Sequence, residues 1–323
     1  MNTKQLLASA ILSITLAASA QAQTLTVYSA GPESLINHLA QDFTAQSGIA
    51  VNVFQGTTGQ VMARLEAEQA NPIADILISA SWDSAVDLKA RGDLLEHVSP
   101  NATQVPEYLK DTHYVAQGVS ALAMVWNKNS QVTMPKDWSD LAQPAYNNEV
   151  TMPDPAQSGA AFQLITGLLA SQGEDATWSL MQQLKDNNMI VPGPNARALN
   201  PVLQGAKSVV FGAVDYIALG QQADGEAIEV VFPESGTVIA PRPMMIFKST
   251  KSPDQAKAFI DFVLSDAGQE RVAQSYLMPA RTDIPALRPT LNELNLIQYD
   301  EAQYEARRED ILQSFRAIFG QSN

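Results

Sequence analysis

The sequence predicts an α/β fold in two lobes that are joined by a two-strand hinge. Short apolar runs rich in β-branched residues alternate with amphipathic helical stretches along the first third of the chain. Strands separated by helices favour a mostly parallel sheet with right-handed crossovers, flanked by helices. The length of 323 residues exceeds what a single hydrophobic core usually supports. We therefore expect two such lobes.

Three strand–helix units in succession are expected to open the first lobe. The strands are predicted at residues 25–28, 51–54 and 76–78, and the helices at 32–46, 60–69 and 83–91. Leu35, Leu39 and Phe43 recur at helical spacing within the first of these helices. Gly92 is a typical stop signal for the third helix. Ligands on sheets of this kind bind beyond the carboxyl ends of the strands.

The chain is expected to cross to a second lobe near Gly118 and to return near Pro241, and these two crossings form the hinge. In the second lobe, strands are predicted at residues 121–126, 150–152, 208–211, 230–233 and 238–240, with helices at 160–171 and 176–187. Residues 241–247 lead back to the first lobe, which also holds a helix at 253–266. The predicted division is a first lobe of residues 23–117 and 243–290, a second lobe of 118–242, and a C-terminal helical segment of 291–323 that packs on the lobes.

The N-terminus has the pattern of a secretory signal peptide. Lys4 precedes an apolar stretch over residues 6–18, and Ala20-Gln21-Ala22 supplies the small-x-small cleavage pattern. We expect a signal peptide over residues 1–22; a buried N-terminal helix is the alternative. The chain contains no cysteine, which excludes disulfides, thiolate metal sites and a lipid-modified N-terminal cysteine. The predicted location is the periplasm of a Gram-negative bacterium.

The charge pattern argues against several function classes. A net charge of −14 with only 20 lysines and arginines lacks the basic footprint of a nucleic-acid-binding protein. His38, His97 and His113 show no metal-binding spacing, and no G-x-S-x-G nucleophile elbow occurs. We expect no metal, no cofactor and no enzymatic activity. A periplasmic phosphoester hydrolase is the alternative from the enzyme classes.

Four short turns rich in serine, threonine and glycine each precede a predicted helix. They are Ser29-Ala30-Gly31, Gly56-Thr57-Thr58-Gly59, Ser79-Ala80-Ser81 and Gln157-Ser158-Gly159. Unpaired N–H groups and the positive end of a helix dipole, together with small hydroxyls, form a natural anion site. The candidate ligands are therefore Ser29, Thr57, Thr58, Ser79, Ser81 and Ser158. Each hydroxyl has a second interpretation, because the same residues are common helix N-caps.

Two arginines and one tryptophan leave similar alternatives open. Arg197 and Arg242 are each either a guanidinium ligand for an anion or a solvated surface charge. Trp82 is either a stacking platform for a ligand or a packed aromatic residue.

Several segments of the chain are similar to one transport family. They are Leu25-Thr26-Val27-Tyr28-Ser29-Ala30, Gly56-Thr57-Thr58-Gly59 with residues 63–68, and residues 71–76, 252–263 and 277–281. The chain resembles the periplasmic solute-binding proteins of ATP-binding-cassette (ABC) importers, in the group around ferric-iron-binding proteins. The resemblance implies a class II periplasmic binding protein, a monomer whose two lobes close on a solute and dock on an inner-membrane permease.

One departure from this group concerns the ligand. Iron-binding members carry two adjacent tyrosines in the second lobe, where this chain has Val214-Asp215-Tyr216, and Ser29 stands where some members have a histidine. Similarity to other members implies a small anionic solute, namely an organophosphate, a sugar phosphate or a phosphonate, with ferric iron as the alternative. In such members acidic residues take the hydroxyl or amine groups of the solute. That role is expected here for Asp215 and Glu234, with Tyr216 beside them; a helix cap, a turn residue and a core tyrosine are the respective alternatives.

Overall fold

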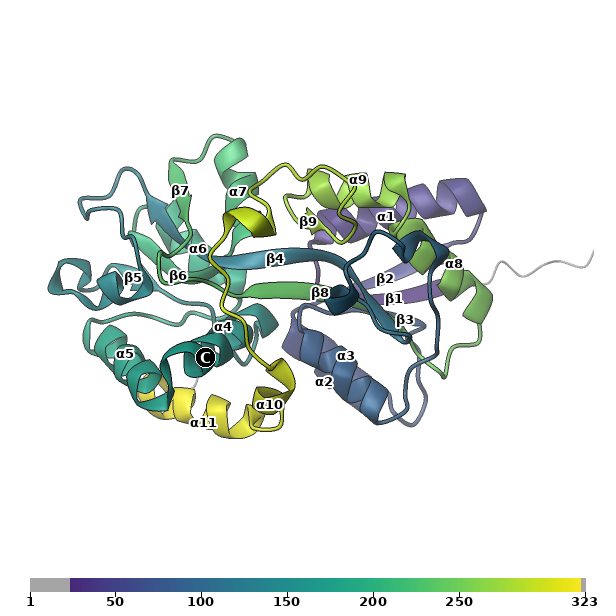
Figure 1. Cartoon of the computed structure of the whole chain (residues 1–323), viewed down its shortest axis with the longest axis horizontal. Helices are drawn as coiled ribbons and strands as arrows, with labels where there is room; N and C mark the ends of the chain where they lie inside the picture. The colour runs from purple at the N-terminus through teal and green to yellow at the C-terminus, as the bar shows by residue number, and fades with distance from the viewer. Residues whose placement is uncertain (1–23, 321–323) are drawn as a thin grey trace, which may run out of the picture.

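Two antiparallel strands, β4 (Tyr114–Asn127) and β8 (Ile239–Ile246), run through both lobes of the molecule (Figure 1). The computed structural model describes residues 24–320, so the predicted signal peptide lies outside the described residues. The described strands form one sheet of order β2-β1-β3-β8-β4-β6-β5, and β7 and β9 (Met278–Pro279) also pair with β4. The predicted two-lobed α/β fold with a two-strand hinge is confirmed.

The hinge contains an irregularity at the first predicted crossing. The pairing of β4 with β8 shifts register between Ala116 and Val119. Gly118 lies at this shift, and a Cβ atom there would lie only 2.8 Å from the carbonyl oxygen of Met278. The close approach of β9 therefore requires glycine at this point.

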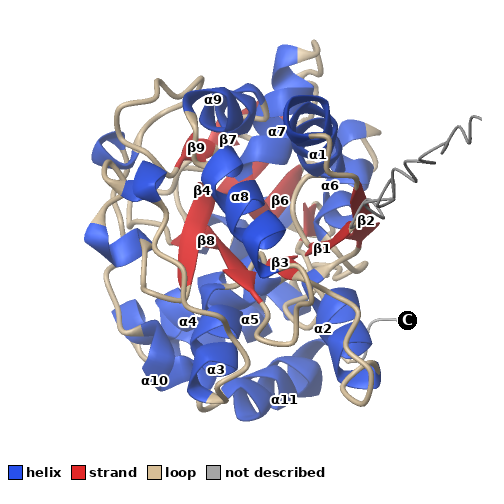
Figure 2. Cartoon of the chain, turned by 90° about the vertical axis from the view of Figure 1, so that its right-hand side faces the viewer, coloured by secondary structure: helices blue, strands red, loops and turns tan. Residues whose placement is uncertain are grey.

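Lobe 1 contains three parallel strands, which β8 and β4 continue in antiparallel pairing, with helices on both faces of the sheet. The strands are β1 (Leu25–Ser29), β2 (Val51–Gln55) and β3 (Ile76–Ile78), and the helices are α1 (Glu33–Ser47), α2 (Thr58–Ala67), α3 (Trp82–Ala90), α8 (Pro253–Val263) and α9 (Asp266–Gln274). Helices α1 and α9 cover one face, and α2 and α3 cover the other (Figures 1 and 2). All predicted elements of this lobe are present, with ends shifted by a few residues.

Lobe 2 differs from the expectation of a mostly parallel sheet. Its strands are β5 (Val150–Thr151), β6 (Val209–Val214) and β7 (Ile228–Val231), and its helices are α4 (Gly159–Gln172), α5 (Glu174–Asp186), α6 (Asn195–Leu203) and α7 (Asp215–Ala223). Only the β5–β6 pair is parallel, whereas β6 and β7 both run antiparallel to β4. That part of the expectation was wrong, because β4 enters this lobe as a hinge strand and fixes the direction of its neighbours.

Short 3-10 helices lie in the connections between these elements. No described helix is both long and apolar enough to cross a membrane. The 3-10 helices are η1 (Pro100–Ala102), η2 (Glu107–Leu109), η3 (Trp138–Ala142), η4 (Pro144–Tyr146) and η5 (Leu291–Glu293).

The C-terminal segment is anchored to lobe 2. It contains α10 (Glu301–Glu305) and α11 (Arg308–Phe319). The N–H of Ile297 donates to the carbonyl oxygen of Thr237 at 2.8 Å, and Ile311 and Phe315 of α11 pack into the lobe 2 core. Helix α10 lies between α3 of lobe 1 and α4 of lobe 2 (Figure 1). We propose the lobe boundaries predicted above on the basis of the two separate cores and this segment.

Candidate functional site

Hydroxyl turns from both lobes meet where β1, β2 and β3 end. A Cβ atom at Gly59, in the second turn, would lie 3.1 Å from the carbonyl oxygen of Ala156 in lobe 2. A Cβ atom at Gly159 would lie 2.8 Å from Cβ of Ser81 in lobe 1. The turns at residues 56–59 and 79–81 therefore lie against residues 156–159 of the opposite lobe.

The strand order brings Arg242 to the same edge. β8 is the neighbour of β3, and the N–H of Ser79 donates to the carbonyl oxygen of Pro243 at 3.0 Å. Arg242 is only 2% exposed, and its Nη1 donates to the carbonyl oxygen of Ala30 at 3.2 Å. Within residues 24–320 its guanidinium makes no ion pair and its Nε has no hydrogen-bond partner. An unpaired buried charge is unfavourable, so the site is suited to a bound anion.

Tyr216 lies against this guanidinium from the other lobe. The Cζ atom of Arg242 is 4.9 Å from the centroid of the Tyr216 ring, which is a favourable cation–π distance. Tyr216 belongs to the first turn of α7. The hinge arginine thus contacts both lobe 1, through Ala30, and lobe 2, through Tyr216.

Three further buried polar atoms near these turns have no hydrogen-bond partner among the described residues. They are Oγ of Ser81, Oε1 of Gln55 and Oε1 of Gln117. Gln55 uses its Nε2 to donate to the carbonyl oxygen of Gly31 at 2.7 Å, and a Cβ atom at Gly31 would lie 3.8 Å from Oε1 of Gln117. Buried polar atoms are normally paired, so several atoms without a partner beside the hydroxyl turns point to a ligand. The two glutamines were not predicted from the sequence.

The predicted hydroxyls also serve the local backbone. Oγ of Ser29 accepts from the N–H of Gly31 at 3.1 Å, and Oγ of Ser79 accepts from the N–H of Ser81 at 3.1 Å. Thr57 forms a capping box with Gln60 at the start of α2. A hydroxyl that accepts one hydrogen bond still has its proton to donate. Capping and ligand binding are therefore compatible for these residues.

Ser158 and Thr58 occupy helix starts on opposite lobes. Ser158 caps α4 by accepting from the N–H of Ala161 at 3.2 Å, and its hydroxyl donates to Oδ1 of Asn195 at 3.1 Å. Thr58 is the first residue of α2 and is 7% exposed. The hydroxyl of Ser158 therefore both accepts and donates a hydrogen bond within lobe 2, whereas Oγ of Ser29 accepts one from Gly31.

Asp215 has partners inside the protein. Its fully buried carboxylate pairs with Arg288 and accepts from the N–H groups of Ala121 at 2.8 Å and Tyr216 at 2.7 Å. Burial raises the pKa of Asp215 to about 6, and Arg288 opposes this rise by favouring the carboxylate. The observed contacts fix the start of α7 against β4 and position Tyr216, rather than presenting a free acceptor to a solute.

The remaining candidates lie at different distances from the turns. Glu234 is exposed, and the N–H and carbonyl oxygen of its backbone bond to Lys136 and Asn295, so the structure does not bring it to the hydroxyl turns. Arg197 is exposed beside Gly193, where a Cβ atom would also lie 3.7 Å from Oε1 of Gln157 in the fourth turn. Trp82 packs edge-on against Tyr114, with ring centroids 5.1 Å apart.

No cluster of three or more histidine, aspartate or glutamate side chains suited to a metal occurs in residues 24–320.

The comparisons with known proteins agree with this architecture. Residues 71–303 match the family described as bacterial extracellular solute-binding proteins. The chain belongs to this family. It is the solute-binding component of an ABC transporter, and the family consists of binding proteins that deliver a small solute to a permease.

Relatives of this solute-binding protein have several named ligands. A putative 2-aminoethylphosphonate-binding periplasmic protein of Salmonella typhi is 25% identical over 291 residues, which cover 85% of each chain. The periplasmic binding protein AfuA of Actinobacillus pleuropneumoniae, solved with fructose-6-phosphate, has a TM-score of 0.83 at 22% identity, covering 92% of this chain and 98% of its own. Iron-bound HitA of Pseudomonas aeruginosa has a TM-score of 0.79 at 20% identity, covering 91% and 99%. The likeness of the two solved structures to this protein shows the shared fold.

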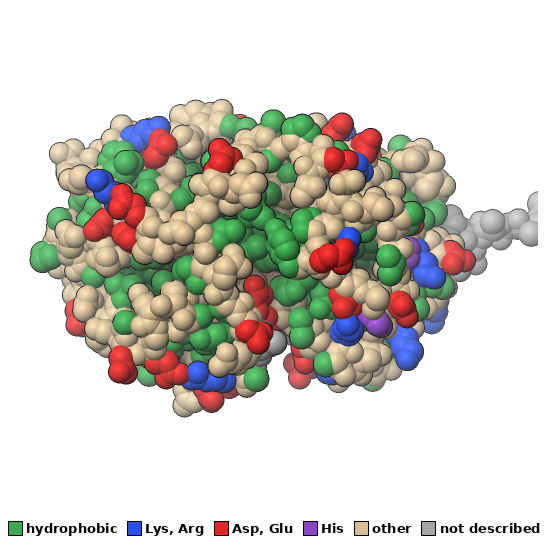
Figure 3. Space-filling model, in the orientation of Figure 1, with side chains coloured by type: hydrophobic (Ala, Val, Ile, Leu, Met, Phe, Trp, Pro, Cys, Tyr) green, Lys and Arg blue, Asp and Glu red, His purple; other side chains and the backbone are tan. Residues whose placement is uncertain are grey.

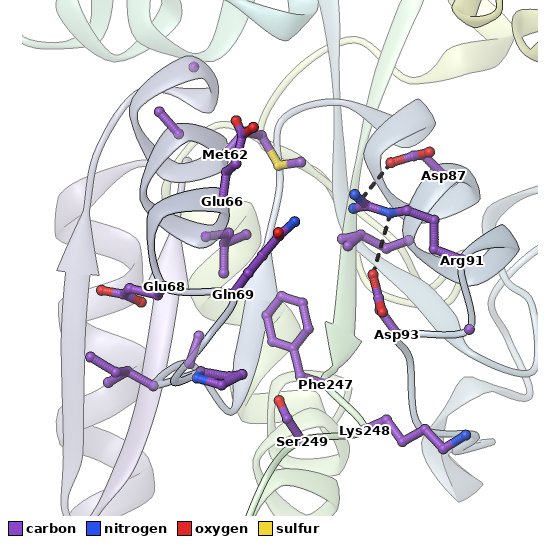
Figure 4. A pocket seen from close by; sticks show the side chains of 18 of the residues that line it. Met62, Glu66, Glu68, Gln69, Asp87, Arg91, Asp93, Phe247, Lys248 and Ser249 are labelled. Atoms are coloured by element: carbon purple, nitrogen blue, oxygen red, sulfur yellow. Dashed lines mark ion pairs between the residues drawn. The ribbon is translucent and has the colours of Figure 1, made fainter.

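The solute-binding protein also has a groove whose lining includes Gly59 of the second hydroxyl turn. It has a volume of about 1220 Å³ and lies between α2 and α3, with Phe247 and Lys248 at its floor and rim (Figure 4). Arg91 spans this region by pairing with Asp87 at 3.2 Å and Asp93 at 3.3 Å. The charged side chains that line this groove are largely paired with each other. The groove therefore differs from the site around Arg242, where the buried guanidinium has no ion-pair partner among the described residues.

Proposed function

We propose that the protein captures a small organic phosphate or phosphonate in the periplasm. The observation that carries this proposal is the buried, unpaired guanidinium of Arg242 beside the hydroxyl turns of both lobes. Arginine can donate two parallel hydrogen bonds to a phosphate, and charge-assisted bonds of this kind are roughly twice as strong as neutral ones. The N-termini of α2, α3 and α4 favour the same negative charge.

The acceptors in the site suit the organic part of the solute. Oε1 of Gln55 and Oε1 of Gln117 can accept from hydroxyl or ammonium groups, which phosphate oxygens do not provide. We infer a bipolar site, with donors around Arg242 and amide acceptors nearby. The names of two relatives, one for 2-aminoethylphosphonate and one solved with fructose-6-phosphate, support this class of solute.

Ferric iron fits these residues less well. Iron(III) prefers anionic oxygen ligands, whereas the tyrosine at the site, Tyr216, lies against a guanidinium. The carboxylate of Asp215 is already paired with Arg288. A permanent positive charge among the ligands opposes a trivalent cation and favours an anion.

We infer that binding works by a shift between open and closed forms. Solute contacts made by both lobes exist together only in the closed form, so the solute stabilises that form. The closed monomer is then recognised by an inner-membrane permease, and the solute is released unchanged, without catalysis.

Isothermal titration calorimetry tests the choice of solute. The panel is 2-aminoethylphosphonate, fructose 6-phosphate, inorganic phosphate and ferric citrate. We expect stoichiometric binding of at least one organic phosphorus compound and no release of phosphate during incubation. Arg242→Gln should weaken that binding roughly 100-fold, the effect of losing a hydrogen bond to a charged group.

The matched control is Arg91→Gln, which removes an arginine of lobe 1 at the α2–α3 groove. Its affinity should equal that of the wild type. Tight binding of ferric iron alone, or unchanged affinity in Arg242→Gln, would contradict the proposed function.

A further inference from the structure

The C-terminal segment reaches across the gap between the lobes. Oε2 of Glu301 in α10 accepts from Nε2 of Gln163 in α4 at 3.1 Å, and the hydroxyl of Tyr299 lies 2.9 Å from Oγ1 of Thr166. These contacts attach α10 to lobe 2. The other side of α10 packs against α3 of lobe 1, beside a groove of about 850 Å³ that Asp83, Tyr299 and Glu301 help to line. Acidic side chains gather beside the hollow between the lobes (Figure 3).

Asp83 of α3 is the lobe 1 partner in this contact. It is 3% exposed, and its Oδ1 has no hydrogen-bond partner among the described residues. Glu301 of α10 lines the same groove as Asp83, and the carboxyl groups of Glu301 and Glu305 both raise the pKa of Asp83. Two carboxyl groups can share a hydrogen bond only when one of them holds a proton.

Positive charge at this contact is scarce. Arg308 of α11 is the basic residue facing Asp83, and it already pairs with Glu305 at 2.9 Å and lies over the ring of Phe162 at 4.0 Å. Asp83 and Glu305 therefore share one guanidinium, and the hydroxyl of Tyr299 and the carboxylate of Asp300 lie near Glu301. Three ionised carboxylates in this buried space would repel one another.

We propose that Asp83, together with Glu305 and Glu301 of α10, forms a proton-binding site between the lobes, so that closure of the lobes takes up a proton. Asp83 moves with lobe 1, whereas α10 moves with lobe 2. Opening at the hinge separates the carboxyl groups and exposes Asp83 to water, and the proton then leaves. The contact between Asp83 and the carboxyl groups of α10 is therefore stable only while a proton is bound there.

The direction of the pH dependence follows from the two states. In the closed form, burial and the nearby carboxyl groups raise the pKa of Asp83 from 3.8 to about 8, and burial raises that of Glu301 to about 7. In the open form the pKa of Asp83 returns towards its ordinary value. Between these two values the closed form holds more protons, so a rise in pH favours the open form, by up to about tenfold per pH unit for one proton.

The test measures closure without any solute. The chain has no cysteine, so Lys248→Cys in lobe 1 and Asp175→Cys in lobe 2, both exposed, accept a pair of spin labels. Double electron–electron resonance then gives the ratio of closed to open forms of the mature chain from pH 5 to pH 9. We expect this ratio to fall several-fold per pH unit towards pH 8, and to fall much less steeply in Asp83→Asn, where Glu301 is the remaining carboxyl group of the site with a raised pKa.

Two further variants sharpen the result. Asp87→Asn lies one turn along α3, where the carboxylate pairs with Arg91, and should keep the full pH dependence. Glu305→Gln removes one neighbouring charge and should shift the transition to lower pH, which also tests the proposal if Asp83→Asn folds poorly. Identical pH profiles in the wild type, Asp83→Asn and Glu305→Gln would overturn the proposal. Because no solute is used, this outcome is independent of whether a phosphate is bound at Arg242.

Discussion

At the scale of single residues, some groups of the site around Arg242 could be predicted from the sequence and others could not. The hydroxyl turns were predictable, because small residues at strand–helix junctions carry a known local signal. Gln55 and Gln117 were not, since a glutamine in a strand has no motif, and its free Oε1 emerges only from tertiary packing. Arg242 could be named from the sequence but its burial could not.

Two hydroxyls of the turns should respond differently to removal. Ser81→Ala deletes a buried oxygen without a described partner, so stability should change by less than about 0.5 kcal/mol while solute affinity falls about tenfold. Thr57→Val breaks the capping box of α2 and should lower the free energy of unfolding by about 1 kcal/mol. Urea denaturation and calorimetry on both variants check this contrast. A large loss of stability in Ser81→Ala would show that its hydroxyl is structural.

At the scale of elements, the helices and strands of lobe 1 were predicted well and parts of lobe 2 were not. The strand predicted at 121–126 is β4, which begins at Tyr114. The prediction began too late because Gln117 and Gly118 interrupt the apolar pattern where β4 is irregular. Helix α6 was missed, since Pro201 lies inside it. The partner of Asp215 is 73 residues away, at Arg288, and no local pattern identifies such a pair.

The ion pair of Asp215 with Arg288 should anchor α7. Both side chains are fully buried, so Asp215→Ala leaves an unpaired guanidinium inside the protein. We expect a loss of roughly 3–5 kcal/mol in the free energy of unfolding, measured by chemical denaturation. Asp224→Ala at the exposed end of α7 is the control and should change stability by less than about 0.5 kcal/mol. A small effect at Asp215 would mean that water compensates the arginine.

At the scale of the whole molecule, the described form is closed: residues 156–159 of lobe 2 touch the hydroxyl turns of lobe 1. In this form α3, the helix that carries Asp83, also packs against α10. Solute binding and protonation would therefore stabilise one and the same form. The two glycines at the contact, Gly59 and Gly159, allow the lobes to approach so closely.

Gly159 offers a direct test of closure. A Cβ atom there would lie 2.8 Å from Cβ of Ser81 and 2.9 Å from the carbonyl oxygen of Ala80, both on the opposite lobe. Gly159→Ala should therefore hold the lobes apart without disturbing either core, and alanine is a better helix former than glycine within α4. We expect unchanged or slightly higher thermal stability, weaker solute binding, and a larger radius of gyration than the wild type in small-angle X-ray scattering with solute present. Gly220→Ala in α7, where the nearest group is Tyr276 at 3.7 Å, should behave like the wild type. Wild-type affinity in Gly159→Ala would show that the solute is held without this contact between the lobes.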